Sequence, residues 1–295
     1  MNKKWKKIGL IGSGISLLYL ISIKPRIIHK PDNTPFRNRF FAHRGLHNMS
    51  PVLKDSGSSY YCKGGMFPEN SYAAIKRAVD YGFGVEFDVH LTKDNIPVVF
   101  HDDSLKRLCG VDGYLRDYTY EELLQFSLYG TTERIPTLSS ILEMIHGQVP
   151  IIIEYKVEKN NAAKLCSICD KLLQNYQGDY CIESFHPLAV HWYKKHRPDI
   201  VRGQLSENFT RTMKYTLPLF LLSHLIGNCY AAPDFIAYNC LHYKELSRLL
   251  CRYLYHSFSI AWTVRSDEQL AKIEPFYDAY IFENFIPEKS TISVA

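Results

Sequence analysis

The sequence GVEFDVHLTKDNIPVVFHDD, residues 84–103, carries the clearest structural signal in the chain. It contains two apolar segments, Val85–Leu91 and Ile96–Phe100, separated by the polar residues 92–95. Parallel neighbouring strands need a much longer crossover connection than this. The short polar connection therefore predicts an antiparallel β-hairpin.

The hairpin brings ionisable side chains to one place. Glu86 and Asp88 are two residues apart on the first strand, so both carboxylates point to the same face. A turn centred on Asp94-Asn95 places His101 roughly opposite Asp88. Two acids and a histidine on an apolar framework cost stability unless a cation or a substrate interacts with them. A solvated strand face with incidental charges is the alternative interpretation.

Outside the hairpin, strand and helix patterns alternate along the chain. The predicted strands cover residues 39–45, 85–91, 150–157, 180–185, 200–205, 235–239, 257–264 and 279–283. Eight strands separated by helices, with Ile96–Phe100 as one extra antiparallel strand, favour a closed (β/α)8 barrel over an open doubly wound sheet. We expect one folded domain over residues 39–290, with a small insertion at about residues 90–135 after the second barrel strand.

The helices between these strands have ordinary lengths. They are predicted at residues 72–81, 138–146, 162–176, 188–196, 217–226, 243–253 and 267–275. Asn70 or Ser71 is a plausible N-cap for the first of them. The apolar segment Leu217–Ile226 is too short to span a bilayer, and we expect it to be a buried helix.

The composition excludes some classes of function. The chain has 295 residues, of which 46% are hydrophobic, and this suffices for a barrel-sized domain. Its formal net charge is +5, but residues 1–39 contain nine Lys/Arg and one Asp. The remaining residues carry 26 Lys/Arg and 29 Asp/Glu, a charge of −3. The folded part therefore lacks the electrostatic footprint of a nucleic-acid-binding protein.

The basic charge surrounds an apolar N-terminal segment. Residues 8–23 are uncharged and mostly apolar, and four lysines precede them. This pattern predicts a single-pass membrane anchor within residues 1–30, followed by a linker at residues 31–38 and a domain outside the cytoplasm. The segment is short for a bilayer, and no Ala-x-Ala-like cleavage site follows it. A cleaved signal peptide and a peripheral helix are the alternatives.

Chemically active side chains lie where the predicted strands end. In a parallel barrel these ends meet at one mouth, which carries the active site in barrel enzymes. With the histidine after the extra strand, these residues are His43, Arg44, Glu86, Asp88, His101, Glu154, Lys156, Ser184, Phe185, Gln204, Tyr238, Trp262, Glu283 and Asn284. Oxygen ligands from Glu86, Asp88 and Glu154 favour Mg²⁺ or Ca²⁺ over zinc. Phe185 and Trp262 are candidates for a substrate wall, with barrel packing as the alternative.

The basic groups at the same mouth suit phosphoryl transfer. Arg44 and Lys156 can hold a phosphate, and the arginine can do so in a bidentate manner. The imidazoles of His43 and His101 can take a proton from the attacking oxygen and give one to the leaving oxygen. A solvated Lys156 is the alternative at that position.

Nine short motifs occur in order between Phe40 and Pro287. They are His43-Arg44-Gly45, Pro68-Glu69-Asn70-Ser71, Glu86-Phe87-Asp88-Val89, Leu91-Thr92-Lys93-Asp94, Pro97-Val98-Val99-Phe100-His101-Asp102, Ile135-Pro136-Thr137-Leu138, Ile153-Glu154-Tyr155-Lys156, Ser184-Phe185 and Trp262-Thr263-Val264. Each motif alone is a weak signal. Together they closely resemble the glycerophosphodiester phosphodiesterases.

The resemblance implies a TIM (β/α)8 barrel of the phospholipase-C-like type with a small insertion after the second strand. It also implies metal-dependent hydrolysis of a glycerophosphodiester to glycerol 3-phosphate and an alcohol, in which a glycerol hydroxyl can act as internal nucleophile. By position, it assigns metal binding to Glu86, Asp88 and Glu154, acid–base catalysis to His43 and His101, and phosphate contact to Arg44 and Lys156. Glu69 is expected to hold the metal or Arg44.

Three departures from the family pattern concern the rim of the mouth. The loop at residues 46–67 is longer than in compact members, Arg265 stands where Asn is common, and Glu283-Asn284 stands where an Asp-containing turn is usual. Two other functions stay open: phospholipase-D-like or cyclising lyase action on lipid phosphodiesters, and binding of phosphodiesters without turnover. The retained carboxylates and both histidines count against the second of these.

Overall fold

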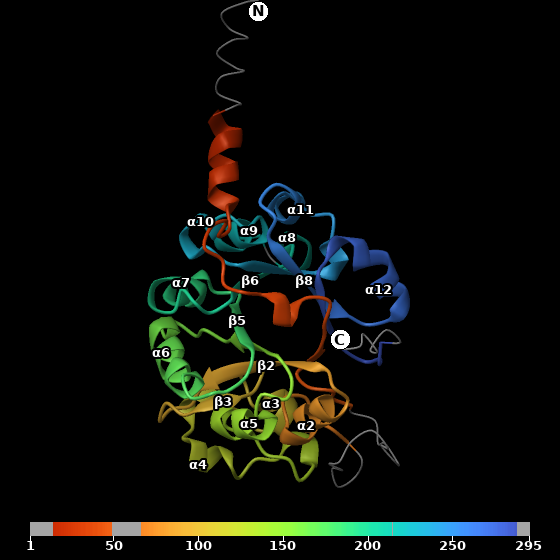
Figure 1. Cartoon of the computed structure of the whole chain (residues 1–295). Helices are drawn as coiled ribbons and strands as arrows, with labels where there is room; N and C mark the ends of the chain where they lie inside the picture. Colours follow the sequence, from red (N-terminus) through yellow and green to blue (C-terminus); the bar gives the residue numbers. More distant parts are fainter. Residues whose placement is uncertain (1–13, 49–65, 214, 288–295) are drawn as a thin grey trace, which may run out of the picture.

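The computed structural model describes residues 14–48, 66–213 and 215–287 and consists of a barrel wrapped by helices (Figure 1). Eight parallel strands follow one another in the order β1-β9-β8-β7-β6-β5-β4-β2, and β1 also pairs with β2. The strands are β1 Phe40–His43, β2 Gly84–Leu91, β4 Ile151–Tyr155, β5 Tyr180–Ser184, β6 Arg202–Ser206, β7 Phe235–Asn239, β8 Phe258–Val264 and β9 Ala279–Phe282. The closed barrel predicted from the alternating pattern is confirmed.

Seven helices correspond to the predicted ones and end one to three residues earlier in most cases. They are α2 Tyr72–Asp80, α5 Leu138–Ile145, α6 Ala162–Leu173, α7 Pro187–His196, α9 Leu217–Ser223, α11 Leu246–Tyr253 and α12 Asp267–Ile273. The side chains of Ser71, Thr137 and Ser266 each accept a hydrogen bond from the backbone N–H three residues later. These caps fix the first turns of α2, α5 and α12.

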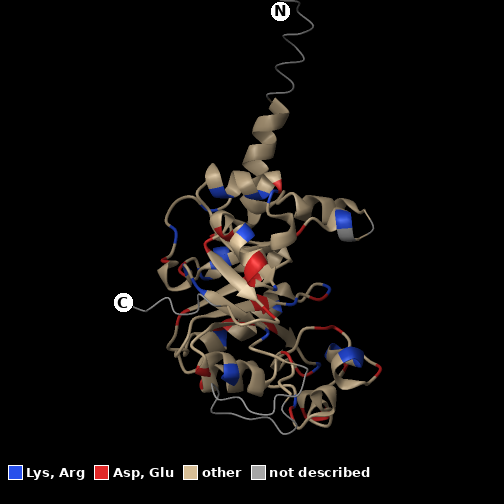
Figure 2. Ribbon diagram, turned by 90° about the vertical axis from the view of Figure 1, so that its right-hand side faces the viewer, with Lys and Arg blue, Asp and Glu red and all other residues tan. Residues whose placement is uncertain are grey.

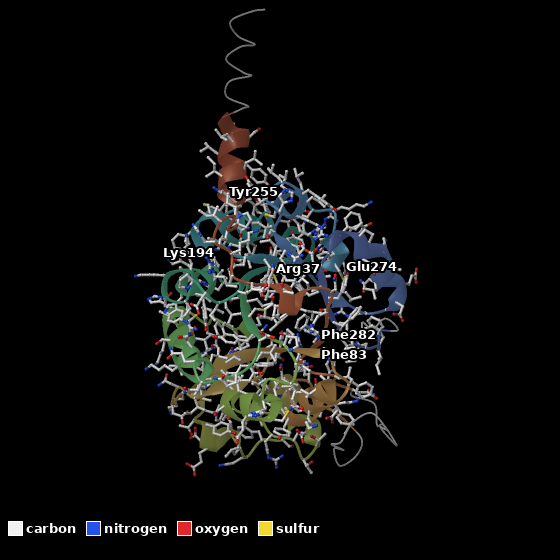
Figure 3. All side chains as sticks on the ribbon, in the orientation of Figure 1. Arg37, Phe83, Lys194, Tyr255, Glu274 and Phe282 are labelled. Atoms are coloured by element: carbon white, nitrogen blue, oxygen red, sulfur yellow. The ribbon has the colours of Figure 1, made fainter. Side chains whose placement is uncertain are left out.

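Alternating residues of the strands build two apolar layers. Phe41, Phe235 and Phe258 are buried in a cluster formed mainly by strand residues, which fills the barrel interior. Residues of the opposite parity pack against the surrounding helices. Phe83 and Phe282 of this outer layer meet edge to face with ring centroids 4.8 Å apart and are labelled in Figure 3. The polar residues of the mouth lie beyond the inner layer.

The predicted hairpin is present, but its register differs by one residue from the prediction. β3 (Pro97–Val99) pairs antiparallel with β2, and the N–H of Phe100 donates to the carbonyl oxygen of Asp88. Asp88 therefore faces Phe100, not His101. The reason is the turn: Thr92 bonds to Ile96, so the loop has three residues, and Asn95 adopts the left-handed conformation that such loops require.

The chain between β3 and α5 forms a small layer with its own core. It contains α3 Lys106–Cys109, η2 Leu115–Asp117, α4 Tyr120–Leu123 and η3 Leu128–Gly130. The buried leucines 105, 108, 115, 123 and 128 pack on one another there. This layer carries α3 and its Arg107 to the rim of the mouth.

The helix α9 differs from its prediction in burial. Leu217 is 64% exposed, and Ser223 is the one fully buried residue of the helix. The described residues between β6 and β7 form the short helices α8 Phe209–Thr212, α9 and α10 Asn228–Ala231. α9 is held at the rim because Ser206 and Tyr238 donate hydrogen bonds to the carbonyls of Leu222 and Ser223. The prediction of a buried helix is therefore wrong.

Residues 14–23 form a helix that projects from the body beside α10 and α11 (Figure 1). Figure 2 shows this helix free of charged residues. Tyr255, labelled in Figure 3, donates a hydrogen bond to the carbonyl of Leu20 near its base. No helix within the described ranges is both long and apolar enough to cross a bilayer. Residues 1–13, the first part of the predicted anchor, lie outside those ranges, so the anchor stays a prediction.

Residues 31–38, predicted as a linker, lie against the amino end of the barrel. Phe36, in η1 (Thr34–Phe36), is buried and stacks on Phe41 with ring centroids 6.4 Å apart. The N–H of Asn38 donates to the carbonyl of Asp278, and Arg26, which precedes this segment, donates to that of Pro233. The segment therefore holds the N-terminal helix against the barrel at several points.

Candidate active site

The turn after β1 sets the first two functional side chains at the mouth. Arg44 and Gly45 both have positive φ angles, +55° and +77°. A Cβ atom on Gly45 would lie 2.7 Å from the backbone of Ala74, so only glycine lets α2 pack this closely. The backbone N–H of Arg44 donates to Glu86. The His-Arg-Gly sequence thus ties the β1 turn to the carboxylates of β2.

Three carboxylates from two neighbouring strands converge at the mouth. Glu86, Asp88 and Glu154 are buried, and one oxygen from each lies within 4.8 Å of the others. The pairing of β2 with β4 places Asp88 directly beside Glu154. Asn70 donates to the second oxygen of Asp88 at 2.7 Å and holds its orientation. The structure therefore brings the predicted metal ligands together.

A fourth buried carboxylate lies beside this cluster. Glu183 of β5 pairs in register with Glu154, and its Oε2 has no hydrogen-bond partner among the described residues. Burial, followed by the charge of Glu154, raises the pKa of Glu183 well above its usual value. The sequence-based prediction named its neighbour Ser184 instead. Glu183 follows the apolar residues Cys181 and Ile182, just as Glu154 follows three isoleucines. The same sequence pattern could therefore have identified Glu183.

The charges at the mouth do not balance. The ammonium of Lys156 lies 2.9 Å from Asp88 and 2.7 Å from Glu154. Although burial alone would raise the pKa of Asp88, Lys156 in particular holds it well below its usual value. Burial, then the charge of Asp88, raises the pKa of Glu86 well above its usual value. The Arg44 guanidinium lies 3.6 Å from Asp88, so four carboxylates face two basic groups. This excess of carboxylates, with an unpartnered oxygen on Glu183, fits a hard divalent cation.

His43 is held by a carboxylate on the adjacent strand end. Its Nδ1 lies 2.6 Å from Oε2 of Glu283, and its Nε2 lies 4.0 Å from Glu86. Burial lowers the pKa of His43 to about 4, although Glu283 acts in the opposite direction. The imidazole is therefore neutral near pH 7 and can accept a proton at Nε2. His47 is half-buried, with its ring 3.8 Å from the same carboxylate of Glu283.

Arg265 and Glu283, both departures from the family pattern, contact each other. The guanidinium of Arg265 bonds to Oε1 of Glu283 at 2.7 Å. The other oxygen of Glu283 is the one that faces His43. Arg265 and Glu283, the two residues that differ from the family pattern, therefore act together on His43.

His101 is part of a network of charged side chains. Its Nδ1 lies 2.6 Å from Asp102, and Arg107 of α3 contacts both Asp102 oxygens at 2.7 Å. Arg107 also bonds to both oxygens of Glu69, and Glu69 contacts Arg44 at 2.7 Å. Glu69 thus holds Arg44, one of its two predicted roles. The part played by Arg107 was missed, because it depends on how the insertion folds back.

Phe185 and Trp262 stand at the side of the mouth. Their rings meet edge to face with centroids 5.5 Å apart, and both are half-buried. They pack on the barrel-interior cluster and also line a cavity of about 140 Å³ with His43, His101 and Lys156. Packing and substrate contact are compatible at these two positions.

The family model that matches this chain describes the Glycerophosphoryl diester phosphodiesterase family and covers residues 43–246, more than half of the chain. A glycerophosphodiester phosphodiesterase of Caldanaerobacter subterraneus is 33% identical over 150 residues, which are 47% of this chain and 61% of that protein. A putative glycerophosphodiester phosphodiesterase of Bacillus subtilis is 28% identical over 234 residues, which are 76% of this chain and 89% of that protein.

A solved structure shares the fold. It is a phosphodiesterase of Oleispira antarctica in complex with the product sn-glycerol-3-phosphate. The TM-score is 0.64 at 23% identity, over 83% of this chain and 93% of the other. At this identity the likeness establishes the barrel architecture.

Proposed function

This chain belongs to the glycerophosphoryl diester phosphodiesterase family and is a phosphoric diester hydrolase, and we propose that it hydrolyses glycerophosphodiesters to glycerol 3-phosphate and an alcohol. The observation that carries the proposal is the mouth of the barrel. There, three buried carboxylates lie between two histidines, each of which contacts a carboxylate through Nδ1.

Glu86, Asp88 and Glu154 would hold a divalent cation, Mg²⁺ or Ca²⁺. When bound, such an ion polarises the phosphoryl oxygens and neutralises their developing charge. Arg44 and Lys156 would contact the phosphate, since both already lie at the same carboxylates. Phe185 and Trp262 would form the apolar side of the substrate site.

The two histidines would act as base and acid. Neutral His43 takes the proton from the attacking oxygen at Nε2, while Glu283 stabilises the imidazolium through Nδ1. The attacking oxygen forms a new bond to phosphorus as the bond to the alcohol oxygen breaks. His101, paired with Asp102, gives a proton to that alcohol oxygen. The attacking oxygen belongs to water or to a glycerol hydroxyl, and in the second case a cyclic phosphate precedes the final product.

We also propose that the N-terminal segment attaches the protein to a membrane, with the barrel outside the cytoplasm. The uncharged residues 8–23 and the lysines before them support this location. Ile15, Leu17 and Leu18 are each at least 60% exposed on the projecting helix. Fractionation of cells that express the full chain tests the proposal: recovery in the soluble fraction would contradict it.

Turnover of glycerophosphocholine by the purified full chain tests the enzymatic proposal. Phosphorus NMR should show glycerol 3-phosphate, and chelation by EDTA should stop its formation until Mg²⁺ or Ca²⁺ is restored. His43→Ala should abolish turnover while the circular dichroism spectrum stays that of the wild type. A cyclic phosphate that accumulates would favour the lyase alternative, and near-wild-type activity of His43→Ala would overturn the assignment.

A further inference from the structure

A second and larger cavity opens beside the catalytic mouth. It has a volume of about 550 Å³ and lies between the ends of β4 and β5 on one side and α9 on the other. Glu154, Lys156 and Phe185 line both this cavity and the catalytic one. We call it the α9 groove. Because these residues line both cavities, the α9 groove lies directly beside the catalytic cavity.

The chemistry of the α9 groove changes along its length. Its charged lining residues are Glu154 and Lys156, shared with the catalytic cavity, and the exposed Asp103. Farther out the wall is apolar and is formed by Val157, Leu219, Leu222, Leu225 and Ile226. A charged end and an apolar body match a ligand with an anionic head and a hydrocarbon tail.

Two leucines of the apolar wall are partly exposed, whereas Leu225 is buried in the core. Leu219 and Leu222 are half-buried and face the groove. The hydrogen bonds from Ser206 and Tyr238 fix the backbone of α9, and Ser223 accepts one from the N–H of Phe209. The position of α9 therefore does not depend on packing of these leucines against the barrel, and the groove is pre-formed.

The far end of the groove reaches the base of the projecting helix. Gly227 and Asn228 line the groove, and they donate hydrogen bonds to the carbonyls of Ser22 and Ile23. The helix carries exposed apolar side chains, including Ile21, just beyond this point. The far end of the groove therefore lies close to the exposed apolar side chains of the helix.

We propose that the α9 groove binds one hydrocarbon chain of a lipid glycerophosphodiester whose phosphate occupies the catalytic mouth. This inference rests on the proposed function and adds a chain-binding subsite to it. The reaction is unchanged: the same phosphorus–oxygen bond breaks, and the chain contributes binding energy. The chain is carried either by the glycerol or by the departing alcohol, and both arrangements share the chemistry that the groove recognises.

Kinetics with substrates of increasing chain length test the subsite. One series carries hexanoyl to dodecanoyl chains on the glycerol of glycerophosphocholine, and the other carries N-acyl chains of the same lengths on glycerophosphoethanolamine, all below the critical micelle concentration. We expect kcat/KM to rise by about three- to fourfold per added methylene in one series, as burial of a CH₂ predicts. Chain-independent kcat/KM in both series would overturn the inference, while hydrolysis of chain-free glycerophosphocholine would leave the proposed function standing.

Two substitutions in α9 distinguish an effect on chain binding in the groove from a general effect on the enzyme. Leu219→Gln places an amide in the apolar wall, and we expect the ratio of kcat/KM for the dodecanoyl to the chain-free substrate to fall about tenfold. Leu217, two residues away, is 64% exposed and does not line the groove. Leu217→Gln should leave that ratio at the wild-type value. An equal loss in both variants would contradict the assignment to the groove.

A binding measurement keeps the inference testable if no diester is turned over. Octyl-, decyl- and dodecylphosphocholine carry the head and the chain but no glycerol, and calorimetry with the full chain gives their affinities below the critical micelle concentration. Affinity should rise with chain length in the wild type and rise less in Leu219→Gln. If no diester is turned over, the proposed function is rejected. An affinity that depends on chain length would still support the groove. Equal affinities for all three compounds would overturn the groove itself.

Discussion

The Nδ1 atom of His43 lies 2.6 Å from Oε2 of Glu283, so the imidazole at the end of β1 is held by a carboxylate that follows the adjacent strand β9. Arg265 bonds to the other oxygen of the same carboxylate. The hydrogen bond fixes which ring nitrogen faces the carboxylate cluster. Glu283 after β9 and Arg265 after β8 therefore set the orientation of His43 at the end of β1.

Glu283→Gln should lower kcat on the order of 10²-fold, because the imidazolium that forms during the reaction loses its stabilising carboxylate. The Glu283 carboxylate also raises the pKa of His43 against the effect of burial. Without it the pKa of His43 falls, so the acidic limb of the kcat/KM profile should move to lower pH. Glu274→Gln, at an exposed position, is the control. An unchanged profile in Glu283→Gln would exclude this role.

Glu86→Gln should remove activity without lowering the stability of the metal-free protein. Burial and the neighbouring carboxylates disfavour the ionised form of Glu86, so a neutral amide of the same size relieves repulsion. The same change removes a proposed metal ligand, and we expect turnover to fall at least about 10³-fold. Thermal melting in EDTA and initial rates with Mg²⁺ measure the two effects. Activity close to that of the wild type would refute the ligand assignment.

Mg²⁺ or Ca²⁺ should raise the melting temperature of the wild-type protein. A ligand that binds only the folded state at about 100 times its Kd adds roughly 2.7 kcal/mol to the free energy of unfolding. The increase should be smaller in Asp88→Asn, which keeps the shape of the side chain but weakens the site. A melting temperature that does not depend on the cation in the wild type would argue against a metal among these carboxylates.

Arg107→Gln should lower kcat about tenfold, because Asp102 loses the group that orients it against His101. Arg107→Lys should restore activity only in part, since an ammonium cannot form the paired contacts that the guanidinium makes with Asp102 and Glu69. The adjacent Lys106 contacts Asp112 instead, so Lys106→Gln is a matched control. Equal rates in Arg107→Gln and Lys106→Gln would show that the contacts of Arg107 with Asp102 and Glu69 do not affect catalysis.

The barrel could be predicted because each strand is a short apolar segment bounded by helix caps and turns, and these are local properties. The rule that active-site residues lie at strand ends selected Glu154 and His43 as candidates without any contact information, and the structure places both at the mouth. The predicted register of the hairpin was wrong by one residue. The register depends on the left-handed conformation of Asn95, which the sequence does not specify uniquely.

The remaining site residues depend on contacts between distant segments. Glu283 reaches His43 only because β9 pairs with β1, and Arg107 reaches Asp102 and Glu69 through the fold of the insertion. The exposure of α9 has a similar origin, because an apolar helix alone predicts burial and does not reveal an open groove. Glu183 was within reach of sequence reasoning, since parallel pairing places it beside Glu154.

The contacts between the N-terminal helix and the barrel determine the orientation of the catalytic opening relative to the helix. Ile23 is fully buried, Phe36 fills the floor of the barrel, and the backbone N–H groups of Arg26 and Asn38 donate to the loops before β7 and β9. The helix and the barrel therefore turn as one body. Any surface that takes up the helix also fixes the direction in which the catalytic opening points.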